Sequence, residues 1–127
     1  MRKKLPKISE TEWEVMGVIW DEAPMTSAEV IAALQARDGS WHPKTAKTLL
    51  NRLVRKGALG FTKEGRGYLY RALAPREACV AAESESFLER LFGGSLQPMV
   101  AHFVERKKLS AKDIAELKKI LEQERTR

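Results

Sequence analysis

Apolar residues recur at helical spacing between Pro43 and Gly57. The positions follow i, i+3, i+4, i+7 and i+8, and this spacing predicts an amphipathic helix. A proline suits the first turn of a helix, where its missing N–H needs no partner, and a glycine suits its end. The side opposite the apolar stripe is polar and mostly basic. The stripe itself consists of Ala46, Leu49, Leu50, Leu53 and Val54.

Two further helices are predicted before this one. Ser9 with Glu12, and Thr26 with Glu29, have the spacing of a capping box, in which two residues bond each other's backbone through their side chains. The first helix is expected to run to about Trp20, before a break at "DEAP", and its wide apolar arc is typical of a central helix. Three short helices, the third of them basic, indicate a helix-turn-helix.

The period changes after Gly57. The segment "ALGFTKEGRGYLYRAL" is rich in strand-favouring residues and predicts two strands, at 59–63 and 68–73, around the turn "EGRG". A basic hairpin directly after a recognition-type helix is typical of the wing of a winged helix. Lys63 and Arg66 near its tip are therefore candidates for contacts to DNA phosphates, and Arg71 is a further one.

Three amphipathic helices are expected beyond Pro75. Their apolar surface is too large for some fifty residues to remain stable alone, so we expect them to pack against the same helices of a second copy in a two-fold symmetric dimer. The alternative is that they fold back onto the winged helix of their own chain. The expected dimer core consists of Phe87, Leu88, Leu91, Leu96, Met99, Val100, Phe103, Val104, Ile114, Leu117 and Leu121.

Length and composition fit this division of the chain. The 127 residues allow one small domain with an appendage, which we place at 1–74 (winged-helix DNA-binding domain) and 75–127 (helical dimerisation domain). The expected fold is mainly α with a small β-wing. No stretch approaches the ~20 apolar residues that span a bilayer, so we expect no membrane insertion. The first residues lack the apolar region of a secretory signal, and the single Cys79 fits a reducing compartment, so the expected location is cytoplasmic.

Positive charge is concentrated around the third predicted helix. Residues 39–74 hold eight basic groups and one acidic group, a net charge of +7, whereas residues 8–38 have a net charge of −6. A solvated helix face usually alternates in sign, and this one does not. Such a concentration is typical of a surface that neutralises phosphates. The basic segment 1–4 is a further, minor candidate for a phosphate contact.

Roles within the basic helix follow from side-chain chemistry. Threonine can hydrogen-bond bases or contact the thymine methyl group, and lysine or arginine prefers guanine O6 and N7. Other basic and amide groups are expected to hold the phosphate backbone, although Asn51 could instead face the wing. Trp41 and His42 are interpreted as packing or as a short strand rather than as readers. The candidates for base edges are Thr45, Lys47, Thr48 and Arg52, and those for phosphates are Lys44, Asn51, Arg55, Lys63 and Arg66.

The order of the motifs carries a resemblance to a known family. "TEWEVMGVIW", "WHPKTAKTLLNRLVRKGAL" and "GRGYLYRAL", followed by "FLERLFGGSLQPMVAHFVE" and "LSAKDIAELKKILE", resemble the penicillinase-repressor (BlaI/MecI type) family of winged-helix repressors. The resemblance covers nearly the whole chain. It implies a homodimeric repressor that binds operators with dyad symmetry, often at genes for resistance to β-lactam antibiotics.

The resemblance also implies a route of induction. In such proteins a membrane-bound antibiotic sensor leads to cleavage of the repressor within its dimerisation helices. The corresponding bond here is His102–Phe103, in "AHFVE". The family usually has an asparagine before this bond, so the histidine is a departure. A cut there would remove the last helix.

Other chemistry is not indicated by the sequence. One cysteine and two distant histidines give no metal-ligand spacing, and the C-terminal cysteine cluster of copper-responsive relatives is absent. We expect no metal, no cofactor and no catalytic activity. Two other classes remain as alternatives: a winged-helix regulator with a small-molecule pocket in the dimer, and a winged helix that binds only proteins.

Overall fold

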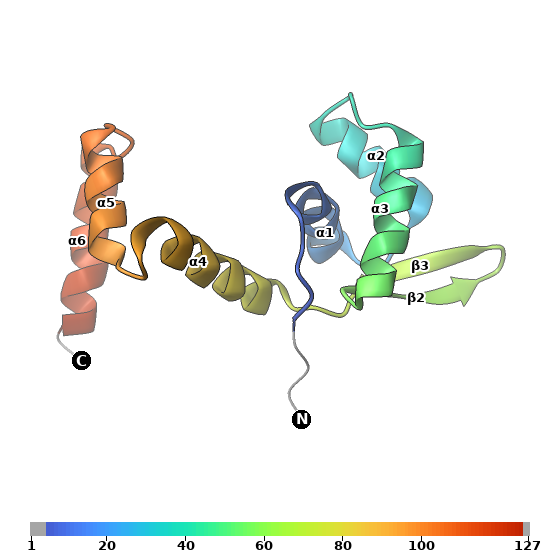
Figure 1. Cartoon of the computed structure of the whole chain (residues 1–127). Coiled ribbons are helices and arrows are strands. Elements are labelled where there is room, and N and C mark those ends of the chain that lie inside the picture. Colours follow the sequence, from blue (N-terminus) through green and yellow to red (C-terminus); the bar gives the residue numbers. More distant parts are fainter. Residues whose placement is uncertain (1–4, 126–127) are drawn as a thin grey trace. The chain divides into compact units, whose positions relative to one another are not determined.

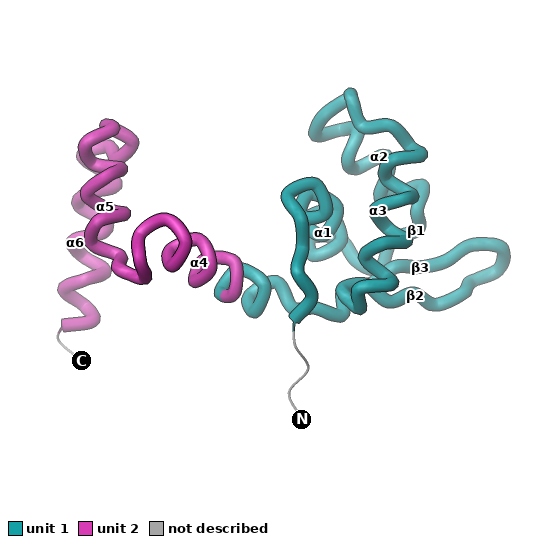
Figure 2. The backbone as a smooth tube through the Cα atoms, viewed as in Figure 1, with its two compact units in different colours: residues 1–81 teal, residues 82–127 magenta. Residues whose placement is uncertain are grey.

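The computed structural model describes residues 5–125 (Figure 1). The basic segment 1–4, a candidate for phosphate contact, lies outside the described residues. Within them the chain forms six helices and a three-stranded antiparallel sheet, which confirms a mainly α fold with a small β-wing. The chain divides into two compact units, residues 1–81 and residues 82–127 (Figure 2).

The first unit begins with α1 (Glu10–Glu22), which forms the centre of the core. Its capping box at Ser9 is confirmed, since the Glu12 backbone donates to the Ser9 hydroxyl and the Ser9 backbone donates to the Glu12 carboxylate. Val15 and Ile19 are fully buried. The helix ends at Glu22, slightly beyond the end expected at Trp20. It ends there because Pro24 lacks an N–H donor and cannot continue the helix.

A short strand that the sequence did not predict follows α1. Met25–Thr26 (β1) pairs antiparallel with Tyr70 and Leu69 of the wing, so it adds a third strand to the hairpin. Two residues are too few to show a period. Thr26 then caps α2 (Ser27–Arg37) through the expected capping box with Glu29.

The basic helix and the wing form as the sequence predicts. Helix α3 (Pro43–Lys56) ends at Gly57, which has a left-handed backbone (φ 84°), and the β2–β3 hairpin leaves from this end (Figure 1). Strands β2 (Leu59–Glu64) and β3 (Gly67–Ala72) pair antiparallel and differ from the expected bounds by one residue at their ends. Gly65, with φ 59°, starts the tight turn.

The apolar stripe of α3 holds this helix to the body. Ala46, Leu50 and Leu53 are buried completely or nearly so, and Leu49 is 5% exposed. They pack in one hydrophobic cluster with α1, α2 and the base of the wing. The opposite side of α3 consequently remains exposed.

Helix α4 (Arg76–Phe92) starts inside the first unit. Cys79, in its first turns, is buried in the core of that unit, and the Trp20 indole N–H donates to the Ala74 carbonyl at 2.9 Å. The units therefore divide between Ala81 and Ala82, within α4, and not at residue 74 as the sequence suggested. The cause is this packing of the helix start, which the Pro75 break does not reveal.

The second unit contains the rest of α4, α5 (Leu96–Glu105) and α6 (Ala111–Arg125). Ser110 and Asp113 bond reciprocally at the start of α6, in the pattern that Ser9 and Glu12 form at the start of α1. No residue of α5 or α6 is buried within the chain. The apolar sides of these helices are therefore available to a partner.

Candidate nucleic-acid interface

A shallow groove of about 470 Å³ lies along one side of α3. Three of the four candidates for base contacts line it, together with one phosphate candidate. Its basic and hydroxyl groups can bind acceptors and donors on base edges. The lining residues are His42, Lys44, Thr45, Thr48, Leu49 and Arg52.

His42 is a groove residue that the sequence interpretation missed. It is the N-cap of α3, and its Nδ1 accepts a hydrogen bond from the Lys44 backbone N–H at 3.2 Å. With Nδ1 as the acceptor, the neutral ring carries its proton on Nε2, which can donate to a ligand. Its position directly before Pro43 could have indicated this role, because proline favours the first position of a helix and the residue before it is then the N-cap. Trp41, by contrast, packs partly buried against the core, as expected.

The hydroxyl group of Thr48 is already engaged within α3. It donates to the Lys44 carbonyl at 3.0 Å, so it has no proton left to donate to a base. The oxygen can still accept a hydrogen bond, and the methyl group can contact thymine. Thr48 is therefore suited to an amino group of adenine or cytosine, or to a thymine methyl.

The remaining candidates lie on a neighbouring stripe of the same helix. Lys47, Asn51 and Arg55 are spaced four residues apart, so they share one side of α3, and none of them lines the groove. All three are exposed. Within residues 5–125 their side chains form no hydrogen bond or ion pair, so they are free to meet an external ligand.

Lys56, the last residue of α3, points away from this surface. Its ammonium group donates to the Lys7 carbonyl and forms an ion pair with the fully buried carboxylate of Glu12. Burial raises the pKa of Glu12, but the hydrogen bonds from Lys56 and Ser9 outweigh it and leave this pKa below the ordinary value. The pair thus ties the end of α3 to α1.

The wing adds a second basic element. Lys63 on β2 and Arg66 in the turn are exposed, as expected for phosphate contacts, and neither has a partner among the described residues. Arg71 instead donates to the Thr62 hydroxyl across the two strands. In the chain, only Gly57 and Ala58 separate α3 from β2, the first strand of the wing.

Comparison with known proteins decides the family. The family model described as penicillinase repressor matches residues 8–123. The chain belongs to the penicillinase repressor family. Members of this family are DNA-binding transcription regulators and not enzymes.

Individual relatives are similar in sequence to this chain over almost its whole length. The penicillinase repressor of Bacillus licheniformis is 42% identical over 125 residues, which is 98% of this chain and 97% of that protein. The methicillin resistance regulatory protein MecI of Staphylococcus aureus (strain N315) is 33% identical over 121 residues, covering 95% and 98% of the two chains.

Two solved structures resemble the first unit. The DNA-binding domain of the repressor BlaI, in solution, matches with a TM-score of 0.53 at 44% identity, covering 59% of this chain and 90% of that one. The monomeric form of Bacillus licheniformis BlaI in complex with the blaP half-operator matches with a TM-score of 0.51 at 42% identity, covering 60% and 92%. The winged helix is therefore confirmed.

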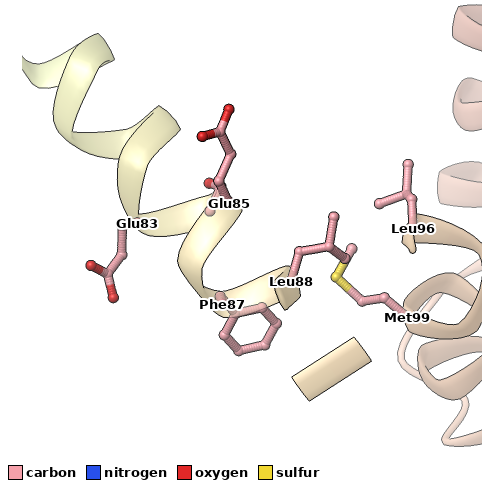
Figure 3. A pocket seen from close by; sticks show the side chains of 7 residues that line it. Glu83, Glu85, Phe87, Leu88, Leu96 and Met99 are labelled. Atoms are coloured by element: carbon pink, nitrogen blue, oxygen red, sulfur yellow. The ribbon is translucent and has the colours of Figure 1, made fainter. Parts of the chain in front are cut away.

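The second unit of this penicillinase repressor family member exposes much apolar surface. Leu91 is 58% exposed and Leu121 is 65% exposed. A cavity of about 400 Å³ opens between α4 and α5, where Leu88 and Met99 point toward one another (Figure 3). Its walls are mostly apolar, and Glu83 and Glu85 also line it. Four of its lining residues were expected in the dimer core: Phe87, Leu88, Leu96 and Met99.

Two features are absent from the part of the chain that the structure describes. Among residues 5–125, no three His, Cys, Asp or Glu side chains are grouped to hold a metal ion. None of the helices in this part of the chain is long and apolar enough to cross a lipid bilayer.

Proposed function

We propose that this chain acts in the cytoplasm as a homodimeric repressor that binds inverted-repeat operators of β-lactam response genes. Helix α3 would enter the major groove, and the wing would hold the flanking phosphates. The second units of two copies would form the dimer through their apolar sides. The names of the relatives, penicillinase repressor and methicillin resistance regulatory protein, support the class of genes.

The observation that carries the proposal is the exposed polar side of α3. Its apolar side is buried in the body, while Thr45, Arg52 and their neighbours form an open basic groove. Nothing within residues 5–125 neutralises these charges. A surface of this kind needs an anionic partner, and the half-operator complex of BlaI supports DNA as that partner.

The experiment that tests the proposal is selection of bound fragments from genomic DNA, followed by binding across salt concentrations. We expect an inverted repeat and a steep loss of affinity with salt, because each neutralised phosphate contributes a slope of about −0.9 in log K against log salt. A flat salt response would favour a module that binds only proteins, and would contradict the proposal.

Two arginine variants of α3 separate base reading from phosphate binding. Arg52→Ala removes a groove residue, so we expect relaxed preference at one base pair, a change of about 1–3 kcal/mol in discrimination. Arg55→Ala removes the same type of side chain three residues along the helix, at a position that does not line the groove. This change should weaken binding to all sequences alike. Affinity for a panel of single-base operator variants measures both. Equal, uniform weakening by both changes would refute base reading by Arg52.

We also propose that induction cuts the chain at His102–Phe103. The bond lies within α5, and a cut there separates α6 from the first part of the dimer surface. Antibiotic-treated source cells should accumulate an N-terminal fragment ending near His102, detectable by mass spectrometry of the immunoprecipitated protein. If only intact chain were found at full induction, a membrane-bound sensor acting by proteolysis would be excluded for this protein.

A second candidate function rests on the cavity between α4 and α5. Its apolar walls and volume are compatible with a small aromatic effector, as in regulators that release DNA on binding a ligand. A compound that lowered operator affinity of the purified dimer without cutting it would favour this function. The apolar side of a partner helix could fill the same space. Loss of the cavity on dimerisation would therefore argue against effector binding.

A further inference from the structure

The wing carries an exposed aromatic pair that DNA recognition by basic groups does not explain. Phe61 on β2 is 48% exposed and Tyr68 on β3 is 43% exposed. Their rings pack edge to face with centroids 4.6 Å apart. Large apolar groups gathered on a protruding element are unusual unless a partner covers them.

The register of the hairpin defines the side on which this pair lies. Phe61 is opposite Tyr70, and Lys63 is opposite Tyr68, so all four side chains share one face of the sheet. Tyr70, at the inner end, is 8% exposed and belongs to the core. The aromatic pair therefore begins at the body and continues outward along the wing toward its basic tip.

Lys63, a candidate for a phosphate contact, lies on the same face as this pair. Directly opposed side chains on antiparallel strands are about 4.5–5.5 Å apart at Cβ, so Lys63 and Tyr68 are close neighbours. Within one DNA strand, phosphates follow each other at about 3.4 Å along the helix axis, with a deoxyribose between them. A phosphate held by Lys63 would consequently bring a sugar to the aromatic rings.

We propose that Phe61 and Tyr68 form an apolar contact with the deoxyribose groups that flank the phosphate bound by the wing. The proposal rests on the proposed operator binding. It assigns to the wing a part of the affinity that does not depend on salt, because burying apolar surface releases no counterions. The deoxyribose ring offers C–H groups suited to an aromatic face, and this contact is independent of base sequence.

The test is the salt dependence of binding by the full chain. The double variant Phe61→Ser/Tyr68→Ser should lose about tenfold in affinity for the selected inverted-repeat duplex, as expected for two half-exposed rings that become covered. The slope of log K against log salt should stay as in the wild type. Lys63→Ala on the same face should instead make the slope shallower by about 0.9.

Leu69→Ser is the matched control for the double variant. Leu69 lies on the same hairpin but on its opposite face, where it pairs with Thr62. It should bind as the wild type does, because its side chain would not meet the sugars. If Leu69→Ser lost as much affinity as the double variant, or if the double variant bound normally, the aromatic pair would be only packing within the hairpin.

A measurement on the wild type covers the case of a variant that fails to fold. Isotope-filtered NMR of the labelled chain with an unlabelled selected duplex should show contacts from the ring protons of Phe61 and Tyr68 to deoxyribose protons. Their absence in a saturated complex would overturn the proposal while leaving operator binding intact. Failure of the wild type to bind any duplex would overturn operator binding and this contact together.

Discussion

Leu117→Glu is expected to convert the proposed homodimer to monomers and to lower the affinity for an inverted repeat by ~10²–10⁴-fold. Leu117 lies on the apolar side of α6, is 38% exposed, and falls on one stripe with Ile114 and Leu121. A buried carboxylate without a partner would oppose association. Loss of the dimer removes the gain from binding two linked half-sites, although each winged helix remains intact.

Ala115→Glu is the matched control for this change. It introduces the same charge into the same helix, two residues away and thus on the other side. Analytical ultracentrifugation should find this variant dimeric, and its operator affinity should match the wild type. Binding to an isolated half-site should be equal for both variants. A Leu117→Glu protein that stays dimeric would contradict the assignment of this stripe to the dimer core.

Lys56→Met is expected to lower the free energy of unfolding by about 2–3 kcal/mol. The change removes the cation that faces the fully buried Glu12 and leaves a carboxylate without charge compensation. Breaking a buried pair in this way typically costs about 3–5 kcal/mol, and the partial exposure of Lys56 reduces the effect. The contact of Lys56 with the Lys7 carbonyl is lost as well. Urea unfolding at neutral pH measures the difference.

Arg55→Met provides the control for the stability effect. It removes a basic group from the same last turn of α3, but this group has no buried partner, so the loss should stay below about 0.5 kcal/mol. Glu12→Gln combined with Lys56→Met should recover part of the lost stability, because the uncompensated charge is gone. Equal losses for the two single variants would show that the pair is unimportant.

The stability effect of Lys56→Met should also depend on pH. The pKa of Glu12 is lower in the folded protein than its ordinary value of 4.5, so its charged form stabilises the fold above that value. This contribution is lost as the pH falls through the lowered pKa. The difference between wild type and Lys56→Met should therefore be complete near neutral pH and shrink under acidic conditions.

The local pattern of the sequence was sufficient for most elements. The capping boxes at Ser9 and Thr26, the end of α3 at Gly57, and the hairpin turn were predicted because each depends on residues a few positions apart. The basic side of α3 was predicted for the same reason, since helical periodicity alone sorts its residues into an apolar stripe and a polar side.

Only the tertiary structure revealed features that join distant segments. The pairing of β1 with β3, the Glu12–Lys56 ion pair and the anchoring of Ala74 by Trp20 connect residues more than forty positions apart. A single sequence has no local period for such contacts. For this reason the sequence places the start of α4 in the second unit, whereas the structure buries Cys79 in the core of the first.

The sequence by itself determined the helices, their caps, the wing and the basic character of α3, because these follow from spacing and charge. The tertiary structure decided which polar residues share the groove, placing His42 there and leaving Lys47 on the neighbouring stripe. It also decided that the Lys56 ammonium group pairs with Glu12 of the same chain and not with an external ligand. The physical reason is that the direction of a side chain around α3 depends on how the whole helix packs against the core.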